Sequence, residues 1–146
     1  LLKEIENEEC FNELLVLRNF IQTNSECGRW DEAAERFADF FNGEGTWNNM
    51  DTGRQNRFKD ALKPNLFEWD AVMNEQTSIH DWRVGLPTNT TVLSCRRTIE
   101  PAREIVNLLR CHMTSWKFRE YNEGGHMAPL TKPDLINPII AEELIT

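Results

Sequence analysis

The segment EGGHMAPL, residues 123–130, decides the fold of this chain. A short run that alternates apolar and polar residues, 116–121, precedes it, and Pro133, which suits the first turn of a helix, follows it. We therefore predict a strand, a glycine turn and a helix, which leaves His126 on a loop at the carboxyl end of a strand. In open α/β sheets ligands bind at that edge. A histidine that only completes a tight turn is the alternative interpretation.

A second strand and two more helices are predicted around this segment. Residues 90–94, with the sequence TTVLS, are short and rich in β-branched side chains, which is typical of a buried parallel strand. Residues 100–112 and 135–144 carry the apolar side chains of helices. The order strand, helix, strand, helix predicts that the two strands are parallel and joined by a helical crossover.

The first half of the chain predicts helices and no strand, because its apolar residues recur at three- and four-residue spacing. Four segments are expected: residues 1–22, a helix from the N-cap Asp31 to the C-cap pair Asn42 and Gly43, residues 51–62 up to Pro64, and residues 65–73. The aromatic residues of this half are expected to pack as its core. An alternative is that Phe41 and Trp47 line an apolar substrate pocket.

The order and spacing of these segments resemble the C-terminal part of an α/β-hydrolase. In that family the catalytic histidine follows the last core strand, often as Gly-His before a small or apolar run and a helix that begins with proline; Gly125, His126 and Pro133 match this pattern. The resemblance implies an α/β fold in which residues 83–146 form the C-terminal part of the core, with its last two parallel strands and flanking helices. Residues 1–82 would form an all-helical cap, or lid.

The resemblance also implies serine-type hydrolysis of an ester or a similar small apolar substrate, with His126 as the general base and Met127 beside the substrate. The family places its nucleophile in a Gly-x-Ser-x-Gly turn. The serines of this chain lack the flanking glycines: Ser25, Ser78, Ser94 and Ser115. We therefore expect the nucleophile to lie in an N-terminal part of the same fold that these residues do not include, and we expect this chain to be inactive alone.

The acid of the triad departs from the family pattern. Arg97 stands where the spacing of the family would put an aspartate, and a guanidinium cannot accept the imidazole N–H. Glu100 is the nearest carboxylate, although its place beside Pro101 also suits a helix N-terminus. A non-catalytic α/β-hydrolase-like module for binding or interaction is therefore the alternative function. A purely helical interaction domain is a third possibility, against which the two strand-like segments argue.

The composition excludes some partners. The net charge of −8 argues against binding of nucleic acid, whose phosphates require a basic surface. The chain has no apolar run of the ~18 residues that a membrane span requires, so we expect no membrane partner. The four cysteines form no Cys-x-x-Cys pair and have no zinc-finger spacing, which favours reduced thiols in a cytoplasmic protein. We expect no metal and no cofactor, and a small-molecule substrate as the ligand.

Overall fold

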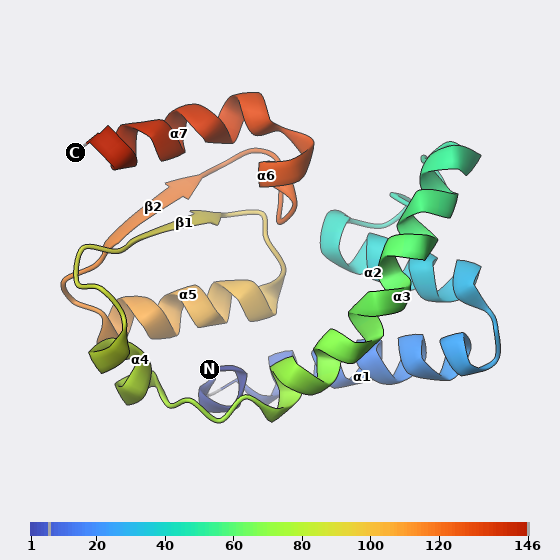
Figure 1. Cartoon of the computed structure of the whole chain (residues 1–146), viewed down its shortest axis with the longest axis horizontal. Coiled ribbons are helices and arrows are strands. Elements are labelled where there is room, and N and C mark those ends of the chain that lie inside the picture. The colour runs from blue at the N-terminus through green and yellow to red at the C-terminus, as the bar shows by residue number, and fades with distance from the viewer. Residues whose placement is uncertain (6, 146) are drawn as a thin grey trace. The chain divides into compact units, whose positions relative to one another are not determined.

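The computed structural model describes residues 1–5 and 7–145, and it divides the chain into two compact units, Leu1–Thr77 and Ser78–Thr146 (Figure 1). The boundary lies before the predicted end of the cap at residue 82. The reason is a capping box that begins a new helix, α4 (Ile79–Gly85): the Ser78 hydroxyl accepts from the Asp81 N–H at 3.1 Å, and the Asp81 carboxylate accepts from the Ser78 N–H at 3.3 Å. Helix α4 packs against a helix of the second unit.

Every regular element that the structure describes in the first unit is a helix. A short 3₁₀ helix, Leu2–Glu4, is followed by α1 (Glu8–Glu26), α2 (Trp30–Asn42) and α3 (Thr52–Asn74). Gly43, with a φ of 100°, is the C-cap of α2, as predicted. Asp31 is not the N-cap of that helix: Arg29 is, and Asp31 lies in the first turn, where a carboxylate interacts favourably with the helix dipole.

Helix α3 shows where a local sequence rule gave the wrong result. The helix continues through Pro64, which was predicted to end it, so the segments predicted at 51–62 and 65–73 are one helix. Proline inside a helix costs about 3 kcal/mol. Leu62 before the proline, and Trp69 and Met73 after it, are all buried in the same core. We attribute the continuous helix to this packing, because tertiary burial of one helix face contributes more than local propensity.

The core of the first unit lies where α1, α2 and α3 meet. Leu14, Leu17 and Ile21 follow one another at helical spacing on α1, and the last two have no exposed surface. The facing residues of α2 are alanines, which allow two helix backbones to approach closely. The other buried members of this core come from α2, α3 and the loop between them: Ala33, Ala34, Ala38, Trp47, Leu62, Trp69 and Met73.

Leu17→Ala should destabilise the first unit by about 2–5 kcal/mol, because it removes a fully buried side chain and leaves a cavity. The matched control is the neighbouring Val16→Ala, which truncates a side chain that is 60% exposed. Urea unfolding followed by near-ultraviolet circular dichroism measures both variants. Equal midpoints for the two variants would contradict this assignment of the core.

The second unit contains a parallel pair of strands with helices beside it. Its elements after α4 are β1 (Thr91–Cys95), α5 (Glu100–His112), β2 (Lys117–Tyr121), α6 (Ala128–Thr131) and α7 (Pro133–Ile145). The strands pair in parallel, with Thr91 opposite Lys117 and Cys95 opposite Tyr121. The predicted combination of helices with a parallel sheet is confirmed, and α5 has the predicted bounds. Helix α6 was not predicted, and α7 begins at Pro133 and continues through Pro138.

Helices α5 and α7 cover opposite faces of the strand pair (Figure 1). From α5, the guanidinium of Arg110 lies over the Phe118 ring, 5.3 Å from its centre. From α7, Glu143 contacts Lys117, the preceding residue of β2. Consecutive side chains of a strand point to opposite faces. The two helices therefore cover the two faces of the small sheet. The register of β1 on β2 decides which residues lie together at the edge where both strands end.

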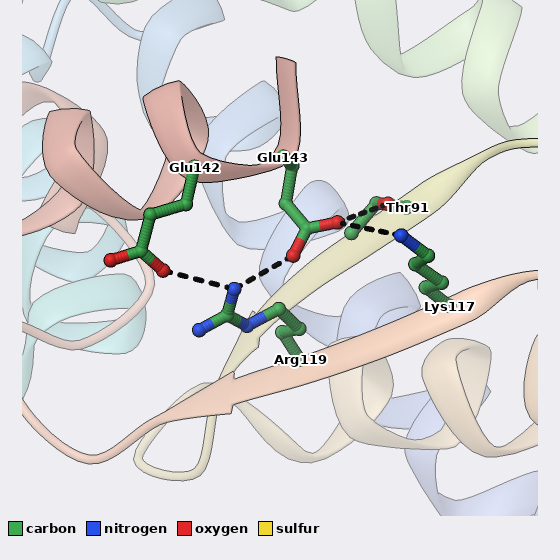
Figure 2. A network of polar contacts seen from close by, with 5 residues as sticks. All are labelled: Thr91, Lys117, Arg119, Glu142 and Glu143. Atoms are coloured by element: carbon green, nitrogen blue, oxygen red, sulfur yellow. Dashed lines mark hydrogen bonds and ion pairs between the residues drawn. The ribbon is translucent and has the colours of Figure 1, made fainter. Parts of the chain in front are cut away.

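A network of polar contacts joins α7 to the sheet (Figure 2). Arg119 Nη1 donates to Glu143 Oε1 at 2.7 Å and to Glu142 Oε2 at 3.1 Å. The second oxygen of Glu143 accepts from the Thr91 hydroxyl at 3.0 Å and lies 3.7 Å from Lys117 Nζ. The hydrogen bonds from Arg119 and Thr91 hold the pKa of Glu143 below its ordinary value. One carboxylate thus contacts both strands from the last helix.

Acid should weaken this connection between α7 and the sheet. Because the pKa of Glu143 is lower in the folded state, the network contributes stability above the ordinary glutamate pKa of 4.5, and this contribution is lost as the pH falls through the lowered value. Glu143→Gln should lower the unfolding midpoint of the second unit at pH 7. In this variant the midpoint should also fall less between pH 7 and pH 3 than it does in the wild type. Glu142→Gln, which changes the other acceptor of Arg119, is the control. Parallel midpoint-against-pH curves for wild type and Glu143→Gln would contradict the network.

Candidate functional site

His126 lies on the loop that leaves the carboxyl end of β2, as the sequence predicted. Parallel pairing places this loop beside the turn between β1 and α5, because both follow the same edge of the sheet. The Arg96 N–H donates to the Tyr121 carbonyl at 3.0 Å and extends the pairing past the strand ends. Beyond it, the Thr98 hydroxyl lies 2.9 Å from Nδ1 of His126. The two residues are thus joined across the ends of the two strands.

Two glycines allow the loop to turn toward this position. Gly124 has a φ of 97° and Gly125 a φ of 68°, values that residues with a side chain rarely adopt. A Cβ atom on Gly124 would lie 2.6 Å from the Cβ of Ala128, which is fully buried. A Cβ on Gly125 would meet only the carbonyl oxygen of Arg97, at 4.0 Å. At position 124 both the positive φ and the close packing against Ala128 therefore require glycine. At position 125 only the positive φ does so.

The environment of His126 favours its neutral form. The side chain is exposed, but the surrounding protein displaces enough water to hold the imidazole pKa below its ordinary value. Desolvation is the cause, because it disfavours the charged imidazolium. A neutral imidazole at physiological pH is able to accept a proton, which a general base must do.

Glu100, the candidate acid, is engaged elsewhere. It is the first residue of α5 and pairs with Arg103 one turn later in the same helix. Its place at the helix N-terminus is favourable for a carboxylate irrespective of catalysis. The structure therefore brings a hydroxyl, and not this carboxylate, to the histidine.

Sequence reasoning missed Thr98. The expected acid position was counted along the chain, and it fell on Arg97, whose side chain is exposed. Spacing along the chain does not show which of two neighbouring residues in a turn has its side chain directed toward the histidine. The available signal was chemical: Thr98 is a short residue with a hydroxyl that can hydrogen-bond to an imidazole, directly beside the expected position.

A surface groove lies next to the same turn. Its lining includes Ser94, Cys95, Thr98, Glu100, Arg103 and Glu120. Arg96, also in the lining, donates to Glu120 at 3.2 Å. Thr98 belongs both to this groove and to the contact with His126. Most of the lining residues are polar or charged, with Val106 and Cys95 as exceptions, whereas the resemblance predicted a pocket for an apolar substrate.

The three residues predicted to line a substrate pocket lie in different units. Trp47 is 5% exposed and packs in the core of the first unit, with its ring 6.2 Å from that of Phe58. Phe41 is half-buried and its ring lies 4.6 Å from that of Phe37. Met127 directly follows His126, is half-buried, and is the N-cap of α6. Of the three, only Met127 belongs to the unit that contains His126.

Comparisons with protein-family models, with curated proteins and with solved structures gave no match. Two findings bear on the other ligand classes. Among residues 1–5 and 7–145, no group of three or more His, Cys, Asp or Glu side chains is arranged to hold a metal ion. Over the same residues, no helix combines the length and the apolar character that a membrane crossing requires.

Gly124→Ala should destabilise the second unit by about 3 kcal/mol, because a strained φ and a contact with the buried Ala128 add together. Gly125→Ala, the matched control, should cost only about 1 kcal/mol, the penalty for a left-handed residue with a side chain. Thermal and urea unfolding of both variants measure the difference. Equal losses would contradict the packing of this loop.

Proposed function

We propose that the second unit is the C-terminal part of an α/β-hydrolase core, that His126 is its general base, and that the helical first unit is its cap. The observation that carries the proposal is the contact of His126 with Thr98 across the carboxyl ends of two parallel strands. The loop after one strand thereby meets the turn after the other at the edge where ligands bind in such sheets. The low pKa of the exposed imidazole adds support.

The proposed reaction is hydrolysis of an ester by a serine nucleophile. Nε2 of His126 would take the serine proton as the hydroxyl oxygen bonds to the ester carbonyl carbon, and would return it to the alcohol oxygen as the ester C–O bond breaks. A water molecule would then give a proton to Nε2 as its oxygen bonds to the acyl carbon, and Nε2 would return that proton to the serine oxygen as the bond between the serine and the acid breaks. The serine would lie outside these 146 residues, because no serine here has the flanking glycines of a nucleophile elbow.

His126→Ala in the full polypeptide that contains this chain should lower kcat for p-nitrophenyl esters by about 10²–10⁴-fold, the usual contribution of general acid–base catalysis. His112→Ala is the matched control, because His112 is an exposed histidine at the end of α5, and its loss should leave kcat unchanged. Circular dichroism of both variants establishes that they fold. Wild-type turnover in His126→Ala, or equal losses in the two variants, would overturn the proposal.

A second candidate function is a non-catalytic module with the same fold. The observation in its favour is that the Thr98 hydroxyl, which is neutral, lies at Nδ1 of His126, while Glu100, the predicted acid, pairs with Arg103. A fluorophosphonate probe distinguishes the two functions, since it reacts covalently with an activated serine. Labelling of the full polypeptide that depends on His126 supports the hydrolase, and a folded polypeptide that is not labelled supports the module.

A further inference from the structure

We infer that Thr98 is the positioning residue of His126, and that its hydroxyl stands at Nδ1 where a serine-hydrolase triad has a carboxylate. The catalytic meaning of this inference rests on the proposed function, but the geometry does not. Thr98 Oγ1 lies 2.9 Å from Nδ1, which is hydrogen-bonding distance. In a triad the group at Nδ1 selects the tautomer and holds the ring, so that Nε2 faces the reacting atoms.

The backbone fixes Thr98 in this place. The turn begins directly after β1, and the Thr98 N–H donates to the carbonyl of Cys95, the last residue of that strand, at 3.2 Å. Cys95 is buried, at 4% exposed, and is paired in register with Tyr121. Thr98 therefore lies in a short turn between a paired strand and a helix, and its side chain is half-buried.

The histidine is fixed from the other side. Its loop turns at Gly124 and Gly125, and the Ala128 N–H donates to the Gly125 carbonyl at 3.3 Å. The buried Ala128 then begins α6. Backbone hydrogen bonds within three residues hold both Thr98 and His126 in place. The contact between them is therefore better defined than one between two long, mobile surface side chains.

The chemical consequence follows from the charge of the partner. When Nε2 takes a proton, Nδ1–H can donate to Thr98 Oγ1, so the ring keeps its orientation. A hydroxyl carries no charge, and it therefore stabilises the imidazolium less than a carboxylate would. Thr98 thus orients the His126 ring but stabilises its protonated form less than a carboxylate would. A carboxylate introduced at position 98 should place a negative charge beside Nδ1.

The test is an NMR titration of His126 in Thr98→Asp and in the neutral, nearly isosteric Thr98→Asn. If Thr98 faces Nδ1, Thr98→Asp should raise the His126 pKa by about 1 unit or more over Thr98→Asn, because a carboxylate within about 4–6 Å favours the charged ring. The charged residues of the turn and loop are unchanged in both variants: Arg96, Arg97, Glu123 and Lys132. Equal pKa values in the two folded variants would overturn the inference.

A second measurement separates orientation from charge. The ¹⁵N chemical shifts of the His126 ring report its tautomers; Thr98→Ser should preserve the wild-type ratio and Thr98→Val should change it. An unchanged ratio in Thr98→Val would also overturn the inference. Neither measurement requires hydrolysis. A positive titration with full activity in His126→Ala would therefore sustain the positioning of His126 and reject the hydrolase, whereas a negative titration with an inactive His126→Ala would do the reverse.

Discussion

The parallel pairing of β1 with β2 is the constraint on which the candidate site depends. It brings the turn after one strand and the loop after the other to the same edge, although the residues that meet there, Thr98 and His126, are far apart along the chain. No single element carries the site, and a slip of register by one residue would turn the side chains of one strand to the opposite face. The positions of Thr98 and His126 are therefore a property of the pairing.

Two strands alone bury little surface, and the helices beside them provide further contacts. Helix α7 holds the face opposite α5 through Glu143, which receives hydrogen bonds from Thr91 on β1 and Arg119 on β2. Few side chains of this unit are fully buried, among them Met113, Ala128 and Ile136. The first unit, in contrast, has a continuous core of three helices.

The sequence predicted elements well where one local signal determined them. The bounds of α5 and the glycine turn before His126 followed from apolar spacing and from residues that tolerate a positive φ. The prediction failed where distant packing decided the outcome, as in the passage of α3 through Pro64. For the site, the position of His126 could be predicted, but its partner could not. Whether Arg97, Thr98 or Glu100 faces the ring depends on how a turn is oriented against a loop from another strand.

At this edge a histidine contacts a hydroxyl, and the proposed hydrolase function also requires a serine nucleophile. The measurement that tests the central claim most directly is the sequence of the native transcript that encodes this chain. We predict, upstream of residue 1, a Gly-x-Ser-x-Gly turn between a strand-type run and a helix. A transcript whose whole reading frame lacks such a turn would contradict the claim that His126 is the base of a serine hydrolase.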